Sequence, residues 1–327
     1  MDLRTLKVGC FGGGTGLPSV LGGLKRNPWL ELHAIVTMFD SGGSSGQLRD
    51  ELGVLPPGDV LRCALALARN EREARRILLS RLPTFDVSRL GGHTGGNLLL
   101  SLMERYSGDF LAAIEGLRAL LGCTGRVWPV SVDASSVCAR YHDGTTTRGE
   151  VEVDSLQNDG HQIATIWLDP PAQIHRLVAE SIAELDAVIV GPGSFYTSLL
   201  PIFAVNGVRE SLAKVRGPVI CVTNLLTEGR GMRGFTAADA VREVEAAAGR
   251  RIDTVVFNSG RPHTDVLARY AGEQKSLLEL GDLPARCRLM RGRFWCGDMA
   301  RHDRRRLGHA LWGELARVLD ADPARST

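Results

Sequence analysis

The sequence predicts an α/β protein with a Rossmann-like, doubly wound and mostly parallel sheet. One repeated pattern carries this prediction: a short apolar run typical of a buried strand ends in a glycine-rich turn, and a helical pattern follows. The pattern occurs at 6–24, 32–46 and 187–198, and further buried runs occupy 218–224 and 253–258. Since open α/β sheets bind ligands outside the carboxyl ends of their strands, the same turns mark the expected site.

The composition is that of an ordinary globular protein. With 327 residues, 44% of them hydrophobic and 23% charged, the chain can form one large α/β domain or two smaller ones. We expect a single domain over 1–327 with a β-rich excursion at about 127–168. There the periodicity shifts toward two, Val151 and Val153 alternate with acids, and His142-Asp143-Gly144 forms a turn signal.

Charge and cysteine content limit the class of protein. The net charge is only +2, from 39 basic and 37 acidic residues, so no global field favours nucleic acid or membrane as the main partner. The seven cysteines are scattered without a C-x-x-C pair, which fits reduced thiols and argues against a disulfide frame or structural zinc. No apolar stretch approaches the ~20 residues that span a bilayer. We expect a soluble, cytoplasmic protein.

The first glycine turn follows the expected strand Leu6–Phe11 and leads into a helical pattern at 17–24. Strand, glycine turn and helix form a phosphate-binding layout, although neither G-x-G-x-x-G nor a P-loop is present. Four glycines in five residues favour backbone amides that receive a phosphate. The alternative is a tight turn that needs glycine only for packing.

The second turn follows the expected strand Leu32–Phe39, which places Asp40 at its carboxyl end. The Gly/Ser loop at 42–46 can turn amides and hydroxyls toward an anion, and Arg49 lies just beyond it. By itself the loop is equally compatible with a flexible surface turn. An acid at this position also matches the ribose-binding acid of dinucleotide folds, so a nicotinamide enzyme is a rival interpretation.

Two more segments can contribute to the same cleft. Asp59 is expected to cap the helix after a Pro-Pro-Gly turn, or to share a divalent cation with Asp40. His93 and Asn97 lie in a third glycine-rich stretch, where they can point into a cleft or act as a structural histidine and an N-cap.

The turn after 187–190 combines glycines with Ser194, Phe195 and Tyr196, which suits phosphates and the face of a base or sugar. Asn224 ends the next strand. In the excursion, His142, Asp143 and His161 resemble a metal cluster, but turn chemistry explains the first two better.

Arginines are dense in the tail 286–306. An RNA or acidic-partner patch is one reading, and a solvated helix face is the favoured one. No nucleic-acid partner is expected, because no stacked aromatics accompany the arginines in an RNA-binding order. A helix over 307–319 is expected to close the domain.

Five phrases together resemble the CofD-like family, and within it the YvcK-type gluconeogenesis factors. They are GGGTGLPSVLGGLK, IVTMFDSGGSSGQLRDELGVLPPGD, GGHTGGNLLLSLM, GPGSFYTSLLP and TNLLTEGRGMRGFTAADAV. The resemblance implies a domain that binds a nucleoside diphosphate ligand. Gluconeogenesis factors bind UDP-sugars and affect carbon metabolism and cell morphology. The CofD branch transfers a phospholactyl group from a guanylylated donor to a deazaflavin precursor, with magnesium.

Residue by residue, the resemblance places 13–16 on the family's first phosphate turn. Asp40 matches the first acid of Asp-Asp-Gly-Gly, and Asp59 matches the acid of Pro-Pro-Gly-Asp. Ser41 replaces the second acid, which weakens a metal site of the family type because it offers a neutral oxygen. Arg230 stands where the family has Glu in its Met-Thr-Gln-x-Gly-Glu-Thr phrase.

We therefore expect a nucleotide-sugar (UDP-sugar) binding protein of the regulatory, gluconeogenesis-factor type. The alternatives are a magnesium-dependent phospholactyl-type transferase and an NAD(P)-dependent dehydrogenase. Mg²⁺ is the one cofactor considered, no tightly bound organic cofactor is expected, and a homodimer is expected from the family and from general frequency. Asp40 and Asp59 are the candidate metal ligands and catalytic residues. The predicted nucleotide and phosphate site comprises Gly13, Gly14, Thr15, Gly16, Lys25, Gly42, Gly43, Ser44, Ser45, Gly46, Arg49, His93, Asn97, Gly191, Gly193, Ser194, Phe195, Tyr196 and Asn224.

Overall fold

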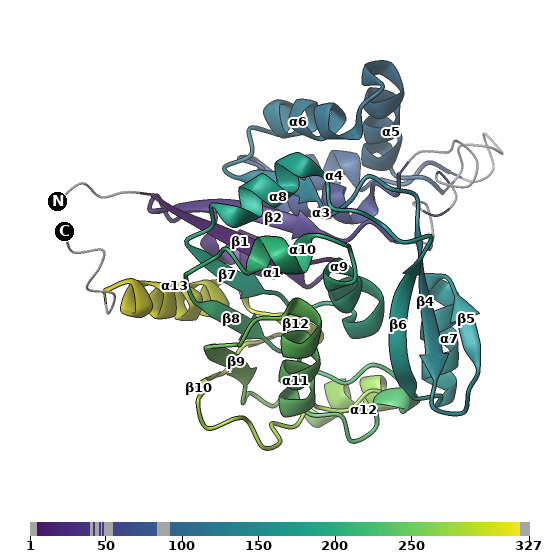
Figure 1. Ribbon diagram of the computed structural model, residues 1–327, viewed down its shortest axis with the longest axis vertical. Coiled ribbons are helices and arrows are strands. Elements are labelled where there is room, and N and C mark those ends of the chain that lie inside the picture. Colours follow the sequence, from purple (N-terminus) through teal and green to yellow (C-terminus); the bar gives the residue numbers. More distant parts are fainter. Residues whose placement is uncertain are drawn as a thin grey trace.

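A seven-stranded parallel sheet forms the centre of the protein (Figure 1). The computed structural model describes residues 5–39, 42, 46, 48, 55–83 and 92–320. The strand order is β10-β9-β8-β7-β1-β2-β3. The strands are β1 Leu6–Gly12, β2 Leu30–Val36, β3 Arg126–Pro129, β7 Ala187–Val190, β8 Val219–Val222, β9 Thr254–Asn258 and β10 Arg288–Gly292. This order confirms the predicted doubly wound fold.

The sheet reverses its direction of growth between β1 and β7. The chain adds β2 and β3 on one side of β1, and then returns to add β7 to β10 on the other side, with Cys10 paired to Ala34 and to Ile189. All four residues of β7 and of β8 are buried, because helices cover both faces of the sheet. The crevice outside the carboxyl ends of β1 and β7 is therefore the topological switch point, where such sheets bind ligands.

Helices cover the sheet in two packed groups (Figure 1). In the first group, α1 packs against α3 and α13, and in the second, α10 packs against α8, α9 and α11. The crossover helices before and after the switch point lie on opposite faces because right-handed connections change face when the sheet changes direction. The helices are α1 Leu17–Leu24, α3 Gly58–Leu67, α4 Glu71–Leu78, α5 Gly95–Ser107, α6 Phe110–Leu121, α8 Arg176–Ala183, α9 Leu200–Phe203, α10 Val208–Leu212, α11 Ala237–Ala248, α12 Thr264–Gly272 and α13 Arg304–Asp320.

A small antiparallel sheet stands beside the main one, on the right of Figure 1. It has the order β5-β4-β6, with β4 Ser136–Tyr141, β5 Thr146–Arg148 and β6 Ile163–Asp169, and it carries helix α7 Glu150–Asp159. This excursion is smaller than the predicted 127–168, because Val127 lies in β3 of the main sheet. The predicted turn at 142–144 connects β4 to β5, where Gly144 has a φ of 89°.

The strand expected from Val151 and Val153 is wrong, because both residues lie in α7. Val153 is fully buried and Val151 is 51% exposed. The acids that alternate with these valines occupy the first turn of the helix, where the helix dipole favours negative charge. Residues two apart lie on the same face of a strand but on nearly opposite sides of a helix, so one exposed and one buried valine fit the helix.

The arginine-rich tail also differs from the expected helix face. It forms β10, followed by the hairpin of β11 Trp295–Cys296 and β12 Met299–His302, and α13 begins only at Arg304. The tail's apolar positions, such as Phe294 and Trp295, are buried while its arginines diverge to different sides of the fold. This divergence brings Arg301 to the site described below and Arg304 to the opposite side of α1.

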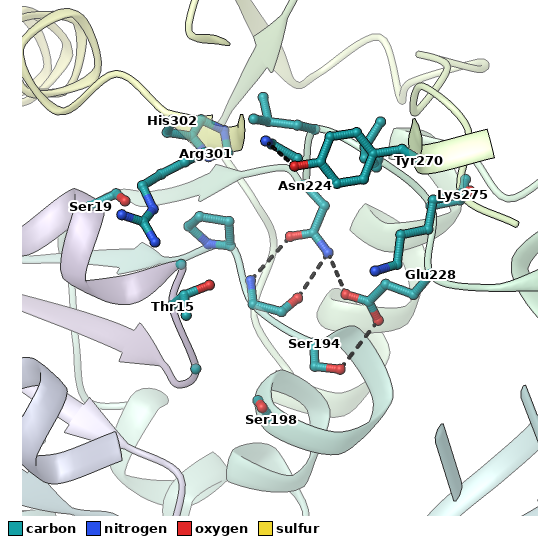
Figure 2. A pocket seen from close by; sticks show the side chains of 18 of the residues that line it. Thr15, Ser19, Ser194, Ser198, Asn224, Glu228, Tyr270, Lys275, Arg301 and His302 are labelled. Atoms are coloured by element: carbon teal, nitrogen blue, oxygen red, sulfur yellow. Dashed lines mark hydrogen bonds between the residues drawn. The ribbon is translucent and has the colours of Figure 1, made fainter. Parts of the chain in front are cut away.

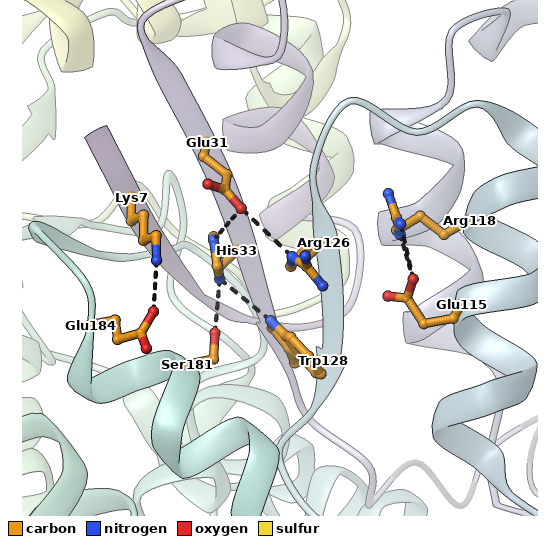
Figure 3. A network of polar contacts seen from close by, with 9 residues as sticks. All are labelled: Lys7, Glu31, His33, Glu115, Arg118, Arg126, Trp128, Ser181 and Glu184. Carbon is orange, nitrogen blue, oxygen red and sulfur yellow. Dashed lines mark hydrogen bonds and ion pairs between the residues drawn. The ribbon is translucent and has the colours of Figure 1, made fainter. Parts of the chain in front are cut away.

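A polar network fixes helix α8 to the edge of the sheet where β2 and β3 lie (Figure 3). The buried ring of His33 contacts Ser181 of α8 at 2.8 Å through Nδ1 and Glu31 at 3.1 Å through Nε2. Trp128 donates to the same Nδ1 at 3.4 Å, so that nitrogen accepts and the proton lies on Nε2. Burial lowers the pKa of His33, which keeps the ring neutral and structural.

Two further findings concern the chain as a whole. All seven cysteines are free, in agreement with the expected absence of a disulfide frame. In the described part of the chain, no helix combines the length and the apolar character that crossing a membrane requires.

Candidate functional site

The turns after β1 and β7 touch each other at the switch point. A Cβ on Gly16 would lie 2.0 Å from the carbonyl oxygen of Pro192, and one on Gly193 would lie 3.3 Å from the carbonyl oxygen of Gly13. Gly13 itself has no room for a side chain, since a Cβ there would lie 2.5 Å from Asp59 Oδ2. Part of the glycine richness therefore serves close packing of the two turns.

Gly14 plays a different part. Its φ of 59° is in the left-handed region that favours glycine, and its nearest neighbour beyond the adjacent chain is the Ser198 hydroxyl, 4.0 Å from a built Cβ. Gly14 lines both of the cavities described below. The first turn thus combines glycines that pack with one glycine, Gly14, that borders the cavities with open space where a side chain would be.

Asp59 holds this turn in place. Its Oδ2 accepts a hydrogen bond from the Gly14 N–H at 2.7 Å, its Oδ1 pairs with Arg62, and the side chain is 4% exposed. The predicted N-cap role is wrong, because Pro57 is the N-cap of α3 and Asp59 lies in its first turn. The Pro-Pro-Gly turn instead folds the carboxylate back onto the β1 turn.

A cavity of about 440 Å³ opens at the switch point (Figure 2). Its walls come from six parts of the chain: the two glycine turns, the loop after β8, helix α7, the Tyr270–Lys275 segment and strand β12. The predicted residues among its lining are Gly14, Thr15, Gly16, Gly193, Ser194 and Asn224. This volume is within the range of small-molecule sites.

Asn224 connects the β7 turn to the loop after β8 (Figure 2). Its Oδ1 accepts the Gly193 N–H at 3.1 Å, and its Nδ2 donates to the Gly193 carbonyl at 2.8 Å and to Glu228 Oε1 at 3.0 Å. Glu228 in turn accepts the Phe195 N–H at 2.8 Å. The β7 turn is therefore fixed by two side chains that themselves line the cavity.

Acidic groups in the cavity have unusual protonation behaviour. Burial, and then the charge of Asp154, raise the pKa of Glu228 to about 7, although the Phe195 N–H opposes the shift. Burial also raises the pKa of Asp154 on α7. His302 at the far wall is neutral near pH 7, because burial lowers its pKa to about 4. This part of the cavity offers oxygen and nitrogen atoms that can accept or donate hydrogen bonds to a polar ligand.

Two cations complete the cavity. Figure 2 shows Arg301 of β12 directed toward Thr15 and Ser19 of the β1 turn and helix α1, and Lys275 directed toward Glu228. The positive side of the cavity therefore lies along the first glycine turn. The carboxyl groups lie across from it, near the β7 turn and the excursion.

A second cavity of about 520 Å³ adjoins the first and shares with it Gly14, Ser198, Glu150 and Asp154. Gly42, Asp59, Thr94 and Asn97 are part of its lining. The turns near 12, 42, 95 and 191 therefore converge on one cleft, as the sequence predicts. We refer to the two adjoining cavities as the cleft.

Several predicted site residues do not face the cleft. Phe195 and Tyr196 pack against Phe235 at 5.2 and 6.3 Å between ring centres, and the Tyr196 hydroxyl donates to Glu243 at 3.1 Å. Their rings belong to the core beside α11, because the π-helix η1 Phe195–Leu199 turns them away from the cavity. The prediction that they face a base or sugar is wrong.

The prediction that Lys25 lies in the nucleotide and phosphate site is also wrong. It is the C-cap residue of α1, at the far end of that helix from the glycine turn, and its Nζ donates to Glu71 at 2.8 Å and to the Ala68 carbonyl at 3.0 Å. His93 is 2% exposed and is not among the residues that line either cavity. Thr94, and not Asn97, is the N-cap of α5.

The remaining predicted residues are glycines away from the cavity lining or lie outside the described residues. Gly46 donates its N–H to the Gly42 carbonyl at 3.0 Å. Gly191 is buried under the β7 turn, where a Cβ would lie 3.1 Å from the Phe11 carbonyl. The predicted residues Asp40, Ser41, Gly43, Ser44, Ser45 and Arg49 lie outside the described residues.

Sequence reasoning missed the charged residues of the cleft: Glu150, Asp154, Glu228, Lys275, Arg301 and His302. Glu228 had a local signal, since it follows the end of β8 by a few residues in a polar loop. The others come from the excursion, a loop and a β-hairpin, so only the tertiary fold brings them together.

The described residues give little support to a magnesium site. No group of three or more His, Cys, Asp or Glu side chains among them is arranged to hold a metal. Asp59 has one oxygen on the Gly14 N–H and the other on Arg62, so a cation would have to displace one of these partners. We therefore derive no chemistry through a metal here.

Comparison with known proteins gives a consistent result. The family described as 2-phospho-L-lactate transferase CofD matches residues 8–293. A Thermotoga maritima protein, provisionally named a gluconeogenesis factor, is 38% identical over 275 residues, which cover 84% of this chain and 86% of its own. The gluconeogenesis factor of Bacillus subtilis is 35% identical over 270 residues, 82% of this chain and 83% of its own.

A solved structure agrees with these relatives. The crystal structure of a UPF0052 family protein from Bacillus halodurans has a TM-score of 0.86 and 31% identity, and it covers 94% of this chain and 99% of its own. The fold, the glycine turns and these similarities lead to one conclusion: the chain belongs to the CofD family and, within it, to the gluconeogenesis factors.

Proposed function

We propose that this protein binds a nucleoside diphosphate sugar, of the UDP-sugar type, in the cleft and acts as a regulatory binding protein in carbon metabolism and cell morphology. The observation that carries the proposal is the contact between the β1 and β7 turns at the switch point, with the open backbone of Gly14 between them and the cavity. Nucleotide phosphates bind at this position in doubly wound sheets.

The diphosphate is assigned to the side of the cavity near Gly14, Thr15 and Gly16. Helix α1 begins here with Gly16 as N-cap and without a described side-chain cap, so the positive end of the helix dipole lies on this side of the cavity. Arg301 lies across from this turn and supplies a positive charge (Figure 2). A helix N-terminus and one arginine together suit a diphosphate.

The sugar and nucleoside are assigned to the acidic side of the cleft. Carboxyl groups of Glu228 and Asp154, with the Ser194 hydroxyl, can accept hydrogen bonds from ligand hydroxyls, and protonated Glu228 can also donate one. Bare phosphate would be repelled by this side. A ligand with phosphates at one end and hydroxyls at the other matches both sides.

The experiment is isothermal titration of the protein with UDP-sugars and with NAD, in chelator and again with Mg²⁺. We expect micromolar binding of a UDP-sugar without added metal and no response to NAD. Arg301→Gln should weaken UDP-sugar binding about tenfold, whereas Arg140→Gln on the exposed side of β4 should change it less than about twofold. Tight NAD binding would favour the dehydrogenase alternative instead.

The family match specifically favours a second candidate, a transferase that acts on a nucleoside diphosphate donor. Such chemistry must neutralise charge on the leaving phosphate, usually with a metal or a nearby cation. Incubation with a guanylylated donor, a deazaflavin acceptor and magnesium, followed by mass spectrometry, tests it. We expect no transferred phosphoester; turnover that disappears in Asp40→Ala and Asp59→Ala would show that the protein is an enzyme.

A further inference from the structure

A second group of arginines lies together away from the cleft. A cavity of about 800 Å³ lies between the C-terminal end of α1, the turn from α3 to α4 and the first turn of α13. Seven of its lining side chains are Lys or Arg and only one, Glu71, is acidic. It shares no lining residue with the cleft. We call it the arginine pocket.

Glu71 is already fully engaged. It accepts Lys25 Nζ at 2.8 Å through Oε2 and pairs with Arg304 through Oε1 at 2.5 Å. Burial alone would raise the pKa of Glu71, but the hydrogen bonds from Lys25 and Arg304 hold it below its ordinary value. One carboxylate thus pairs with two cations at the base of the pocket, and a net positive charge remains there.

The remaining cations have no acidic partner within the described chain. Among the described residues, no carboxylate lies within ion-pair distance of Arg26, Arg69, Arg72, Arg75 or Arg305. Burial and the charge of Arg304 lower the pKa of Arg75, which indicates that positive charges crowd one another here. Such crowding costs free energy unless an anion enters the pocket.

The backbone is shaped to hold the base of the pocket. A Cβ on Gly22 would lie 3.0 Å from Arg304 Nη1, so the missing side chain leaves the space through which Arg304 crosses α1 to reach Glu71. Gly23 and Gly308 allow α1 and α13 to pack closely, since a Cβ on Gly23 would lie 2.4 Å from the Arg304 carbonyl. The cations are therefore mounted on two tightly packed helices, and they form a concave site of ligand size.

We propose that the arginine pocket is a second binding site, for a small molecule that carries two or more phosphate groups. The five pocket arginines that have no acidic partner among the described residues match several phosphate oxygens better than a single charge, because guanidinium groups bind phosphate in a fork. A small ligand is favoured over RNA because the site is concave and of ligand size, and no aromatic side chain lines it for base stacking.

The test uses inorganic tripolyphosphate as the probe, in titration calorimetry at about 50 mM salt. Arg72→Gln with Arg75→Gln removes two pocket cations, and Arg105→Gln with Arg140→Gln removes two exposed cations elsewhere as a matched control. We expect the pocket variant to bind tripolyphosphate at least about tenfold more weakly, and the control to stay within about twofold of the wild type.

Thermal unfolding distinguishes the arginine pocket from the cleft if the cleft also binds tripolyphosphate. Tripolyphosphate should raise the melting temperature of the wild type and the control more than that of the pocket variant. UDP-sugar binding should be equal in all three proteins, so failure of the cleft assignment and failure of the pocket are separate results. Equal loss of affinity in the pocket variant and the control would overturn the proposal, because tripolyphosphate would then respond to the overall positive charge of the protein and not to the pocket.

Competition decides the class of ligand. The arginine pocket is unaltered in the Arg301→Gln protein. An unstructured RNA oligomer that displaces tripolyphosphate from the wild type, but not from the Arg301→Gln protein, would act through the cleft. That result would support the assignment of the pocket to a small anion. RNA that binds more tightly than tripolyphosphate, and loses affinity in the pocket variant, would overturn the proposal.

Discussion

The cleft and the arginine pocket lie at opposite ends of helix α1, and their carboxylates have pKa values shifted in opposite directions. In the cleft, burial raises the pKa of Glu228 to about 7, and the charge of Asp154 adds to the shift. In the pocket, two cations hold the pKa of Glu71 below its ordinary value. Burial therefore decides the direction of the shift for Glu228, whereas for Glu71 the hydrogen bonds from Lys25 and Arg304 outweigh burial.

This difference shows how each region can receive an anion. As we propose, the cleft would receive phosphates at the start of helix α1 and beside Arg301, in a cavity shaped by close-packed glycine turns. The arginine pocket has side-chain cations instead, in a place without a glycine turn after a strand. Under these two proposals, shape would contribute more to recognition in the first region, and charge would contribute more in the second.

The largest effect should follow from breaking the contact between the glycine turns. In Gly16→Ala the new Cβ would lie 2.0 Å from the Pro192 carbonyl oxygen, and neither backbone can move alone. We expect a loss of about 3 kcal/mol in the free energy of unfolding, measured by urea denaturation, and loss of UDP-sugar binding. The control Gly313→Ala, on an open face of α13, should be neutral or stabilise by up to about 1 kcal/mol. Equal behaviour of the two variants would contradict this account of the turn.

Replacing one carboxylate by its amide in each region should show that the cleft and the arginine pocket respond independently. Asp59→Asn weakens the acceptor of the Gly14 N–H and the pair with Arg62, so we expect a loss of about 2 kcal/mol in stability together with weaker UDP-sugar binding. Glu71→Gln should cost about 1–2 kcal/mol and leave UDP-sugar binding unchanged. Added tripolyphosphate should stabilise both variants through the arginine pocket, and it should stabilise Glu71→Gln more, because that pocket has lost the carboxylate that pairs with Lys25 and Arg304. The reverse pattern would mean that the two carboxylates have been assigned to the wrong regions.

Glu228 should give the cleft a characteristic pH dependence. Because its pKa is higher in the folded protein than in the unfolded chain, the folded state binds more protons between roughly pH 4.5 and 7. Stability therefore falls as pH rises through this window, by on the order of 2 kcal/mol, and is constant above it. Glu228→Gln should remove this slope, so that the variant gains on the wild type as pH rises to 8. Urea unfolding at pH 5, 6, 7 and 8 measures the difference, and parallel curves would contradict the shift.

The smallest effect is expected from Tyr196→Phe. The change removes the hydrogen bond to Glu243 but leaves the ring in the core, so we expect a loss of about 1 kcal/mol in stability. UDP-sugar affinity should stay within about twofold, because the ring does not line the cleft. A large loss of affinity at unchanged stability would return Tyr196 to the ligand site that the sequence predicted.

The sequence by itself determined the elements and the edge of the sheet that carries the site. Buried apolar runs such as Ala187–Val190 can only be interior strands, and glycines directly after them restrict the chain to turns that expose backbone. Local composition is enough for both conclusions. Helix α7 shows where local composition fails to predict the element. Acids that alternate with Val151 and Val153 are compatible both with the periodicity of a strand and with the first turn of a helix.

Only the tertiary structure decided which side chains the cleft contains. Asp59 has the sequence of a helix cap, but its carboxylate binds Gly14, 45 residues away, because the β1 turn supplies a better oriented N–H. Phe195 and Tyr196 follow a glycine turn yet face the core, since the path of η1 sets their direction. Arg301 and Arg304 are neighbours in a basic tail that the end of β12 separates into two sites. Side-chain direction depends on contacts between distant segments, and such contacts have no local signal in the sequence.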